Sequence, residues 1–96
     1  MRIEWDQEKA RRNHVKHRIS FEIAREVFED PWAISVRERV VEGEERWQTI
    51  GAIQEGDVLL VAHTPRDDEH DEVIRIISAR KATPRERRVY EEGREG

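Results

Sequence analysis

The chain has 96 residues, enough for one domain and too few for two. Charged residues make up 42% of it, against roughly 25% in ordinary domains, but the apolar residues come in periodic runs, so we expect one folded domain over residues 1–96. The absence of cysteine excludes disulfides and thiolate chemistry. No apolar run is long enough to span a membrane and no signal segment opens the chain, so the cytoplasm is the expected location.

The predicted elements follow from hydrophobic spacing, capping residues and turn residues. In chain order they are a strand over 2–5, a helix over 7–17 capped by Asp6, a helix that begins after Ser20 and ends at Asp30-Pro31, a strand that begins at Trp32, a hairpin turn over 42–45, strands over 46–53 and 58–61, an acidic loop over 65–72, a strand over 72–79, and a helix from Pro84 that ends at Gly93.

This order predicts an α+β fold. Four consecutive strands joined by short turns indicate an antiparallel sheet, and the two early helices should cover one face of it. The continuous apolar run Val58–Val61 predicts a central strand that is covered on both faces.

Charge is distributed unevenly along the chain. Residues 41–72 hold ten acidic and two basic residues, a net charge of −8, whereas residues 73–90 hold six basic residues and one acidic residue, a net charge of +5. A surface with separate regions of opposite sign can meet two different partners.

Two arginines of the last strand are candidate site residues. Arg75 lies inside an apolar run, so its charge must reach solvent, a carboxylate or a ligand. Arg80 ends the same strand, where sites are common. The two are five residues apart, so a regular strand would put them on opposite faces, and they share one site only if a bulge or the strand end reorients one of them.

The last helix adds further cations. Arg85, Arg87 and Arg88 suit bidentate phosphate binding, although for any single one of them a solvated helix face is the favoured interpretation. Glu86 fits the third position of a capping box as well as a site, and Tyr90 fits core packing as well as a site.

The histidines suggest little metal chemistry. His14 and His17 have a spacing that can bind metal, but no partner motif accompanies them, and the acidic residues 67–72 lack the spacing of a calcium loop, so we expect no metal and no cofactor. His17 with Lys16 is better suited to acid–base catalysis or phosphate contact. His63 could titrate in a site, but a partly buried histidine with satisfied hydrogen bonds is the favoured interpretation. Metal-free RNA cleavage needs a base, cations for the phosphorane and an acid, and these residue types are present.

Ordered motifs over nearly the whole chain resemble those of BrnT-type toxins. They are Trp5-Asp6-Gln7-Glu8-Lys9-Ala10, Asn13, Lys16-His17, Ile19-Ser20-Phe21-Glu22, Val27-Phe28-Glu29-Asp30-Pro31, Glu45-Arg46, Ile50-Gly51, Val61, His63-Thr64, Arg75-Ile76-Ile77-Ser78-Ala79-Arg80-Lys81-Ala82, Glu86-Arg87 and Tyr90-Glu91-Glu92-Gly93. One departure is Arg18, which stands where the family commonly has glycine.

The resemblance implies a ribonuclease toxin of a type II toxin–antitoxin pair, with a fold similar to that of RelE-type toxins. It implies that the toxin cuts RNA and inhibits translation, and that a BrnA-type antitoxin blocks it. Operon DNA would be met only indirectly, through the antitoxin, and no membrane is involved.

Under this hypothesis a set of residues carries the activity. Arg46, Arg75 and Arg80 would hold phosphate, and His17 would transfer protons. Glu86 and Tyr90 would be secondary acid–base or orienting groups. The residues that bind RNA would be Lys16, Arg18, Lys81, Arg85 and Arg88. The alternative is a non-catalytic binding module that docks an acidic peptide or nucleic acid through its basic C-terminal segment.

Overall fold

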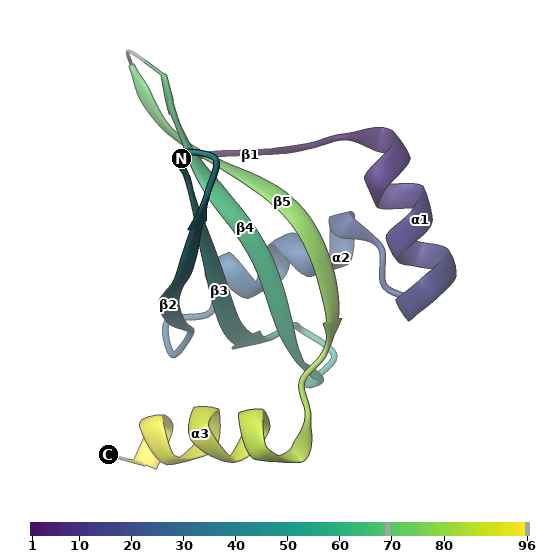
Figure 1. Ribbon diagram of the computed structural model, residues 1–96. Coiled ribbons are helices and arrows are strands. Elements are labelled where there is room, and N and C mark those ends of the chain that lie inside the picture. Colours follow the sequence, from purple (N-terminus) through teal and green to yellow (C-terminus); the bar gives the residue numbers. More distant parts are fainter. Residues whose placement is uncertain (69, 96) are drawn as a thin grey trace.

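The computed structural model describes residues 1–68 and 70–95; Glu69, which falls in the predicted acidic loop, and Gly96 lie outside the described residues. Its elements in chain order are β1 (Arg2–Trp5), α1 (Gln7–His17), α2 (Phe21–Ala24), the 3₁₀ helix η1 (Arg25–Glu29), β2 (Ile34–Val41), β3 (Glu44–Ala52), β4 (Val58–Asp68), β5 (Asp71–Lys81) and α3 (Pro84–Glu95). The strands form one sheet in the order β1-β5-β4-β3-β2 (Figure 1). This is the predicted α+β class.

The sheet is mixed, which corrects the prediction of an antiparallel sheet. β2 to β5 are antiparallel to one another, but β1 pairs in parallel with β5, with Ile3 opposite Ile74 and Trp5 opposite Ile76. Parallel neighbours need a long connection, and here three helices (α1, α2 and η1) and the three other strands lie between β1 and β5 in the chain. A four-residue strand carries no sequence signal for the direction of its partner.

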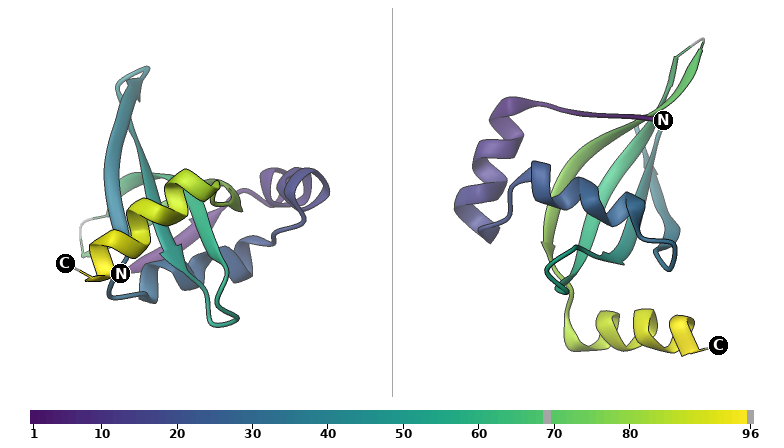
Figure 2. Two further views of the ribbon diagram at one scale, coloured as in Figure 1. Left: turned by 90° about the horizontal axis from the view of Figure 1, so that it is seen from below. Right: turned by 180° about the vertical axis from the view of Figure 1, so that it is seen from behind.

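The early helices pack on one side of the sheet. α2 and η1 cross its face, and α1 lies beside them along β5 (Figure 2). The Asp6 carboxylate accepts hydrogen bonds from the backbone N–H groups of residues 8 and 9, and the Ser20 hydroxyl accepts one from that of residue 23, so both predicted N-caps are confirmed. The second helix is not continuous, because it narrows to the 3₁₀ helix η1 after Ala24. The buried core comprises Ile19, Phe21, Ala24, Val27, Ile53, Leu59, Val61, Ile76 and Ala79.

One β-bulge changes which side chains of β5 face the helices. The pairing of β4 with β5 skips Ile77, so Ile77 is an extra residue in β5. Ile76 and Ala79, three residues apart, both belong to the buried core as a result. By the same shift, Arg75 and Arg80 share the opposite face, which α2 and η1 leave open.

Asn13 of α1 takes the place of a neighbouring strand at β5. Its side-chain amide donates to the Ala79 carbonyl (2.9 Å) and accepts from the Ala79 N–H (3.0 Å), and it also donates to the Ile19 carbonyl (3.0 Å). Asn13 is buried, with 6% of its surface exposed. A buried polar residue therefore fastens α1 to the sheet.

Two predicted boundaries are wrong. The acidic segment is not a loop over 65–72, because β4 runs to Asp68 and β5 starts at Asp71, and paired backbones form a hairpin whatever charge their side chains carry. The last helix does not end at Gly93 but continues to Glu95, and Gly93 lies against Ile34. α3 crosses the end of the sheet (Figure 1). None of the described helices is long and apolar enough to cross a membrane.

Candidate functional site

Five side chains form a row across all five strands on the open face of the sheet. Neighbouring strands pair Glu4 with Arg75, Arg75 with Thr64, and Arg46 with Arg39. Trp47 of β3 pairs with His63 of β4, so the next position of this antiparallel register places Arg46 opposite Thr64. Residues opposite each other in paired strands point to the same face. We call Glu4, Arg75, Thr64, Arg46 and Arg39 the arginine row.

The centre of the arginine row is spaced for one anionic ligand. Arg46 and Arg75 stand on either side of the buried Thr64, so their backbones lie two strand spacings apart, about 10 Å. Their side chains are partly exposed, 29% for Arg46 and 36% for Arg75. Two long arginine side chains that start from both sides of a small residue can converge on a phosphate between them.

One carboxylate moderates the charge of the row. Glu4 accepts a hydrogen bond from Arg66 Nη1 (2.7 Å) and one from Arg75 Nη1 (3.3 Å). Arg2 Nη2 also lies 4.0 Å from Glu4 Oε1, so three guanidinium groups share one carboxylate and a net positive charge remains. This contact fits the simpler interpretation of Arg75, an exposed arginine that pairs with a neighbour, and it also orients the side chain in the row.

Arg46 is only weakly neutralised. Its Nη2 lies 3.4 Å from a carboxylate oxygen of Glu44. Its Nε is buried and has no hydrogen-bond partner among the described residues. The exposed part of the Arg46 guanidinium therefore has one long contact with a carboxylate, and its other N–H groups remain available to an anionic ligand.

Arg80 shares the open face but is held by Glu86. Its two terminal nitrogens donate to the two Glu86 oxygens at 2.8 and 3.0 Å. The Arg80 hydrogen bonds lower the pKa of Glu86, against the opposing effect of burial, and the same pair raises the pKa of Arg80. Glu86 also completes the predicted capping box with Thr83. Glu86 is thus ionised at neutral pH and fixes the position of Arg80.

Tyr90 is a core residue of α3. It is 2% exposed, and its hydroxyl donates to Asp30 Oδ2 (2.6 Å), an oxygen that also accepts the Ala52 N–H (2.8 Å). Burial, followed by the hydrogen bond to Asp30, raises the pKa of Tyr90 to about 12. The packing interpretation of Tyr90 is the one that its surroundings support.

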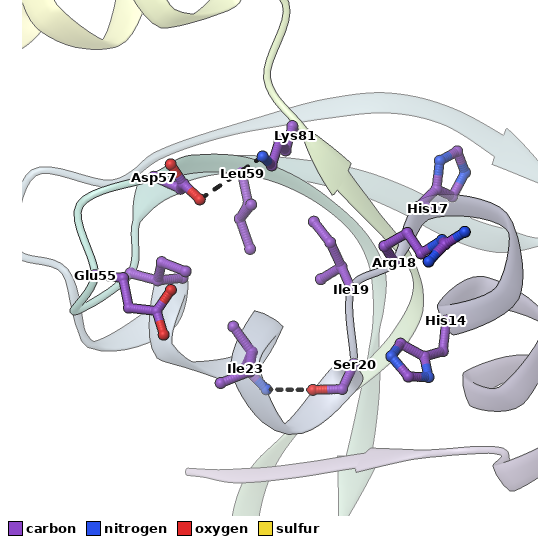
Figure 3. A pocket seen from close by; sticks show the side chains of 11 residues that line it. His14, His17, Arg18, Ile19, Ser20, Ile23, Glu55, Asp57, Leu59 and Lys81 are labelled. Carbon is purple, nitrogen blue, oxygen red and sulfur yellow. Dashed lines mark hydrogen bonds and ion pairs between the residues drawn. The ribbon is translucent and has the colours of Figure 1, made fainter.

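A second group of predicted residues meets on the helical side of the sheet. His17, Arg18 and Lys81 lie at the rim of a pocket of about 380 Å³ (Figure 3). Its apolar part comprises Ile19, Ile23, Ile53 and Leu59, and its other rim carries Glu55 and Asp57. Lys81 Nζ lies 4.0 Å from Asp57 Oδ2. Arg18, which replaces the family's glycine, adopts the left-handed conformation that glycine favours (φ 62°).

The remaining predicted cations lie elsewhere. Lys16 lines a groove between α1 and β5, next to the pocket of Figure 3. Arg85 and Arg88 are exposed on α3. The predicted residues therefore divide between the open face, the helical side and α3.

Comparison with known proteins identifies the family. The model of the family "Ribonuclease toxin, BrnT, of type II toxin-antitoxin system" matches residues 5–86, most of the chain. The chain belongs to the BrnT family. Membership implies an RNA substrate and an antitoxin partner, and it confirms the resemblance seen in the sequence.

A solved BrnT structure supports the fold. The crystal structure of the Brucella abortus ribonuclease toxin BrnT is similar to this chain with a TM-score of 0.68 and 24% identity, over 86% of this chain and 97% of that one. No curated protein matches the sequence. The similarity to RelE-type toxins stays a prediction.

Sequence reasoning missed several members of this BrnT-family site. Glu4 and Arg39 join the arginine row only through strand pairing, and no motif marks them; Thr64 lies in the His63-Thr64 motif, but its place in the row also follows only from strand pairing. His63 is buried as expected but only half satisfied: its Nε2 lies 2.7 Å from the Thr49 hydroxyl, whereas its buried Nδ1 has no hydrogen-bond partner among the described residues. Burial lowers the pKa of His63 to about 4. The Thr49 hydroxyl in turn lies 2.7 Å from that of Ser35.

The arginines of the candidate site can act electrostatically on a phosphate. No group of three His, Asp or Glu residues within residues 1–68 and 70–95 is arranged to hold a metal ion. Arginines keep their charge at every relevant pH, so they stabilise a phosphorane rather than move protons. Proton transfer must come from other groups.

Proposed function

We propose that this chain cleaves RNA without a metal ion at the arginine row, that cleavage inhibits translation, and that a BrnA-type antitoxin neutralises it. The observation that supports this best is the position of Arg46 and Arg75 on either side of Thr64 in the middle of the open face. A single strand laid along this face would bring one phosphate between the two arginines.

The proposed reaction is an internal transfer at phosphorus. The RNA 2′-oxygen attacks, its bond to phosphorus forms, the bond from phosphorus to the 5′-oxygen breaks, and a cyclic phosphate and a free 5′-hydroxyl result. Arg46 and Arg75 bind the non-bridging oxygens, whose negative charge grows in the transition state. Arg80, held by Glu86, contributes a third positive charge on the same face.

Proton transfer is assigned to His17, the residue predicted for it from the sequence; it lies on the helical side of the sheet, so it acts only on a strand that crosses the edge of β5. It makes no hydrogen bond with a described residue, and it borders the groove that Ile77 and Ser78 of β5 also line, between Arg75 and Arg80 in the sequence. One proton must leave the 2′-oxygen and one must reach the 5′-oxygen; His17 carries one of these transfers, and solvent water carries the other. Glu86 and Tyr90, already engaged by Arg80 and Asp30, have orienting roles. Lys16, Arg18, Lys81, Arg85 and Arg88 bind RNA.

An arginine on the other face of the sheet provides a matched control. Arg37 and Arg39 are two residues apart on β2, so a regular strand would place them on the same face. The bulge between them puts Arg37 on the helical side of the sheet and Arg39 on the open face. Arg37 lies 3.4 Å from Glu45, as Arg46 lies 3.4 Å from Glu44. The test compares Arg46→Gln/Arg75→Gln with Arg25→Gln/Arg37→Gln on a labelled RNA in EDTA, with melting temperatures recorded for both.

The expected result separates the two faces. Loss of both row arginines lowers the cleavage rate by at least about 10²-fold, the effect of removing a transition-state donor, while the control variant cleaves at the wild-type rate. Full cleavage by a folded Arg46→Gln/Arg75→Gln variant would overturn the assignment of the row. No cleavage by the wild type in EDTA would overturn metal independence.

The antitoxin is tested in cells. Induced expression should arrest growth and protein synthesis, and co-expression of a BrnA-type neighbour should restore both. Harmless expression of folded protein would support the non-catalytic binding module instead.

A further inference from the structure

A basic groove runs between α1 and the edge of β5. It has a volume of about 250 Å³ and is lined by Lys9, Arg12, Asn13, Lys16, His17, Ile77 and Ser78. The groove exists because β1 stops pairing with β5 at Ile76, so β5 continues as an edge strand beside α1. Asn13 holds the two elements together at Ala79. The groove is therefore a fixed feature of the fold.

The helical wall of the groove is positively charged. Lys9, Arg12 and Lys16 follow one another at intervals of three and four residues, so they form one stripe on α1. Glu8 is the one acidic residue of α1; it pairs with Arg11 and lies 3.8 Å from Arg12 Nε. The charge of the stripe is thus mostly uncompensated within the helix.

The groove joins the two places where predicted site residues meet. Its β5 wall, Ile77 and Ser78, lies between Arg75 and Arg80, which face the arginine-row side of the sheet. At its other end, His17 lines both the groove and the pocket that carries Arg18 and Lys81 (Figure 3). A polyanion that leaves the arginine row across the β5 edge would enter the groove and then reach this pocket.

We propose that the groove binds the sugar–phosphate backbone of single-stranded RNA that flanks the cleaved bond. This proposal rests on the proposed function, because the arginine row defines where the strand comes from. Three cations line the helical wall of the groove at regular spacing, and no acidic residue among those described lines it, so the groove suits the successive phosphates of a nucleic-acid strand. The groove supplies affinity, and the row supplies the chemistry.

The test removes charge inside and outside the groove. Lys9→Gln/Arg12→Gln is the groove variant, and Arg11→Gln/Arg25→Gln, with the same net charge, is the control. The probes are an uncleavable 2′-O-methyl single strand of about ten nucleotides, within the usual site size for single-strand binding, and the corresponding dinucleotide. Affinity is measured over a range of salt concentrations, and melting temperature reports folding.

The groove variant should bind the longer strand about tenfold more weakly and the dinucleotide almost as well as the wild type. The slope of the logarithm of the binding constant against the logarithm of the salt concentration should become shallower by about 1.4, since each of the two lost phosphate contacts to a single strand accounts for about 0.7. The control should match the wild type. A groove variant that binds both probes like the control would overturn the proposal, and so would weaker binding with an unchanged slope.

Two further outcomes keep this proposal separate from the cleavage proposal. Wild-type protein that binds the longer strand through the groove but cuts no RNA would overturn the function of the row and leave the groove supported. An oligoglutamate peptide that binds as tightly as RNA, and loses affinity in the groove variant, would show that the groove is a site for acidic peptides and overturn its assignment to RNA.

Discussion

Replacing Tyr90 with phenylalanine separates a structural role from a catalytic one. The change keeps the buried ring, so no cavity forms, and removes a single hydrogen bond of 2.6 Å to Asp30. Burial raises the pKa of Asp30, but the hydrogen bonds from Ala52, Tyr90 and Trp32 outweigh it and the net shift is downward, so the acceptor is ionised at neutral pH. A hydrogen bond to a charged group contributes about 1.5–3 kcal/mol.

The pKa of Tyr90 sets the pH range of the experiment. Burial, followed by the hydrogen bond to Asp30, raises this pKa from 10.0 to about 12. The stability linked to the phenolic proton is fully present below pH 10 and is lost as the pH rises toward 12, because the unfolded chain releases this proton first. From the hydrogen bond to the ionised Asp30, we expect Tyr90→Phe to lose about 2 kcal/mol of unfolding free energy, and the melting temperature to fall by roughly 4–8 °C per kcal/mol in a domain of this size.

The assay combines stability with cleavage. Urea denaturation followed by tryptophan fluorescence should show the loss at neutral pH, and the difference between wild type and variant should shrink above about pH 10. Asp30→Asn in a double-mutant cycle should show a coupling with Tyr90. Cleavage of RNA per folded molecule should be unchanged. An unchanged midpoint, or a fall in cleavage of about 10²-fold or more in a fully folded variant, would refute the structural interpretation and restore Tyr90 as an acid.

Three other substitutions test the packing and electrostatics of the fold. Glu86→Gln should lower the free energy of unfolding by about 1–3 kcal/mol, because it weakens both a helix cap and a charged pair. The stabilisation by ionised Glu86 is complete above pH 4.5 and is lost as the pH falls below this value. Urea titrations of the variant and the wild type should therefore give the same stability at low pH. Gly51→Ala would place a Cβ 2.8 Å from Val27 Cγ1 and 3.2 Å from the Val27 carbonyl oxygen. Thermal unfolding should therefore show a loss of about 1–3 kcal/mol in unfolding free energy. An unchanged stability would mean that η1 moves freely away from β3. Burial lowers the pKa of His63 to about 4, so its contribution to folding stability is complete above pH 6.5 and is lost as the pH falls toward 4. His63→Gln should therefore flatten the plot of unfolding free energy against pH between these values. An unaltered plot would contradict the neutral, buried state of His63.

Local chemistry made the helix starts predictable. Asp6, Ser20 and Thr83 are caps that act within three residues of themselves, and the structure shows all three in that role. Such interactions depend only on neighbouring residues, so the sequence contains all the information that they need. The break at Ala24 was not predictable in the same way, because apolar spacing does not distinguish an α-helix from the 3₁₀ helix that follows.

The site was predictable in residue type but not in arrangement. Arg75 and Arg80 were recognisable as charges in an apolar strand, yet their common face depends on the bulge at Ile77, which shows only when β4 is paired with β5. Glu4 joined the row through a parallel strand contact that spans 71 residues. Pairing between distant strands is a tertiary property, and local patterns do not determine it.

The parallel contact between β1 and β5 also has a consequence for synthesis. β1 is translated long before β5, so it has no partner until residue 76 has left the ribosome. Contacts of such long sequence separation form late and slowly. A nascent or truncated chain without β5 lacks Arg75 and Arg80, and it also leaves Glu4 without its place in the sheet. A cell that makes this protein is therefore exposed to a complete arginine row only after translation is almost finished.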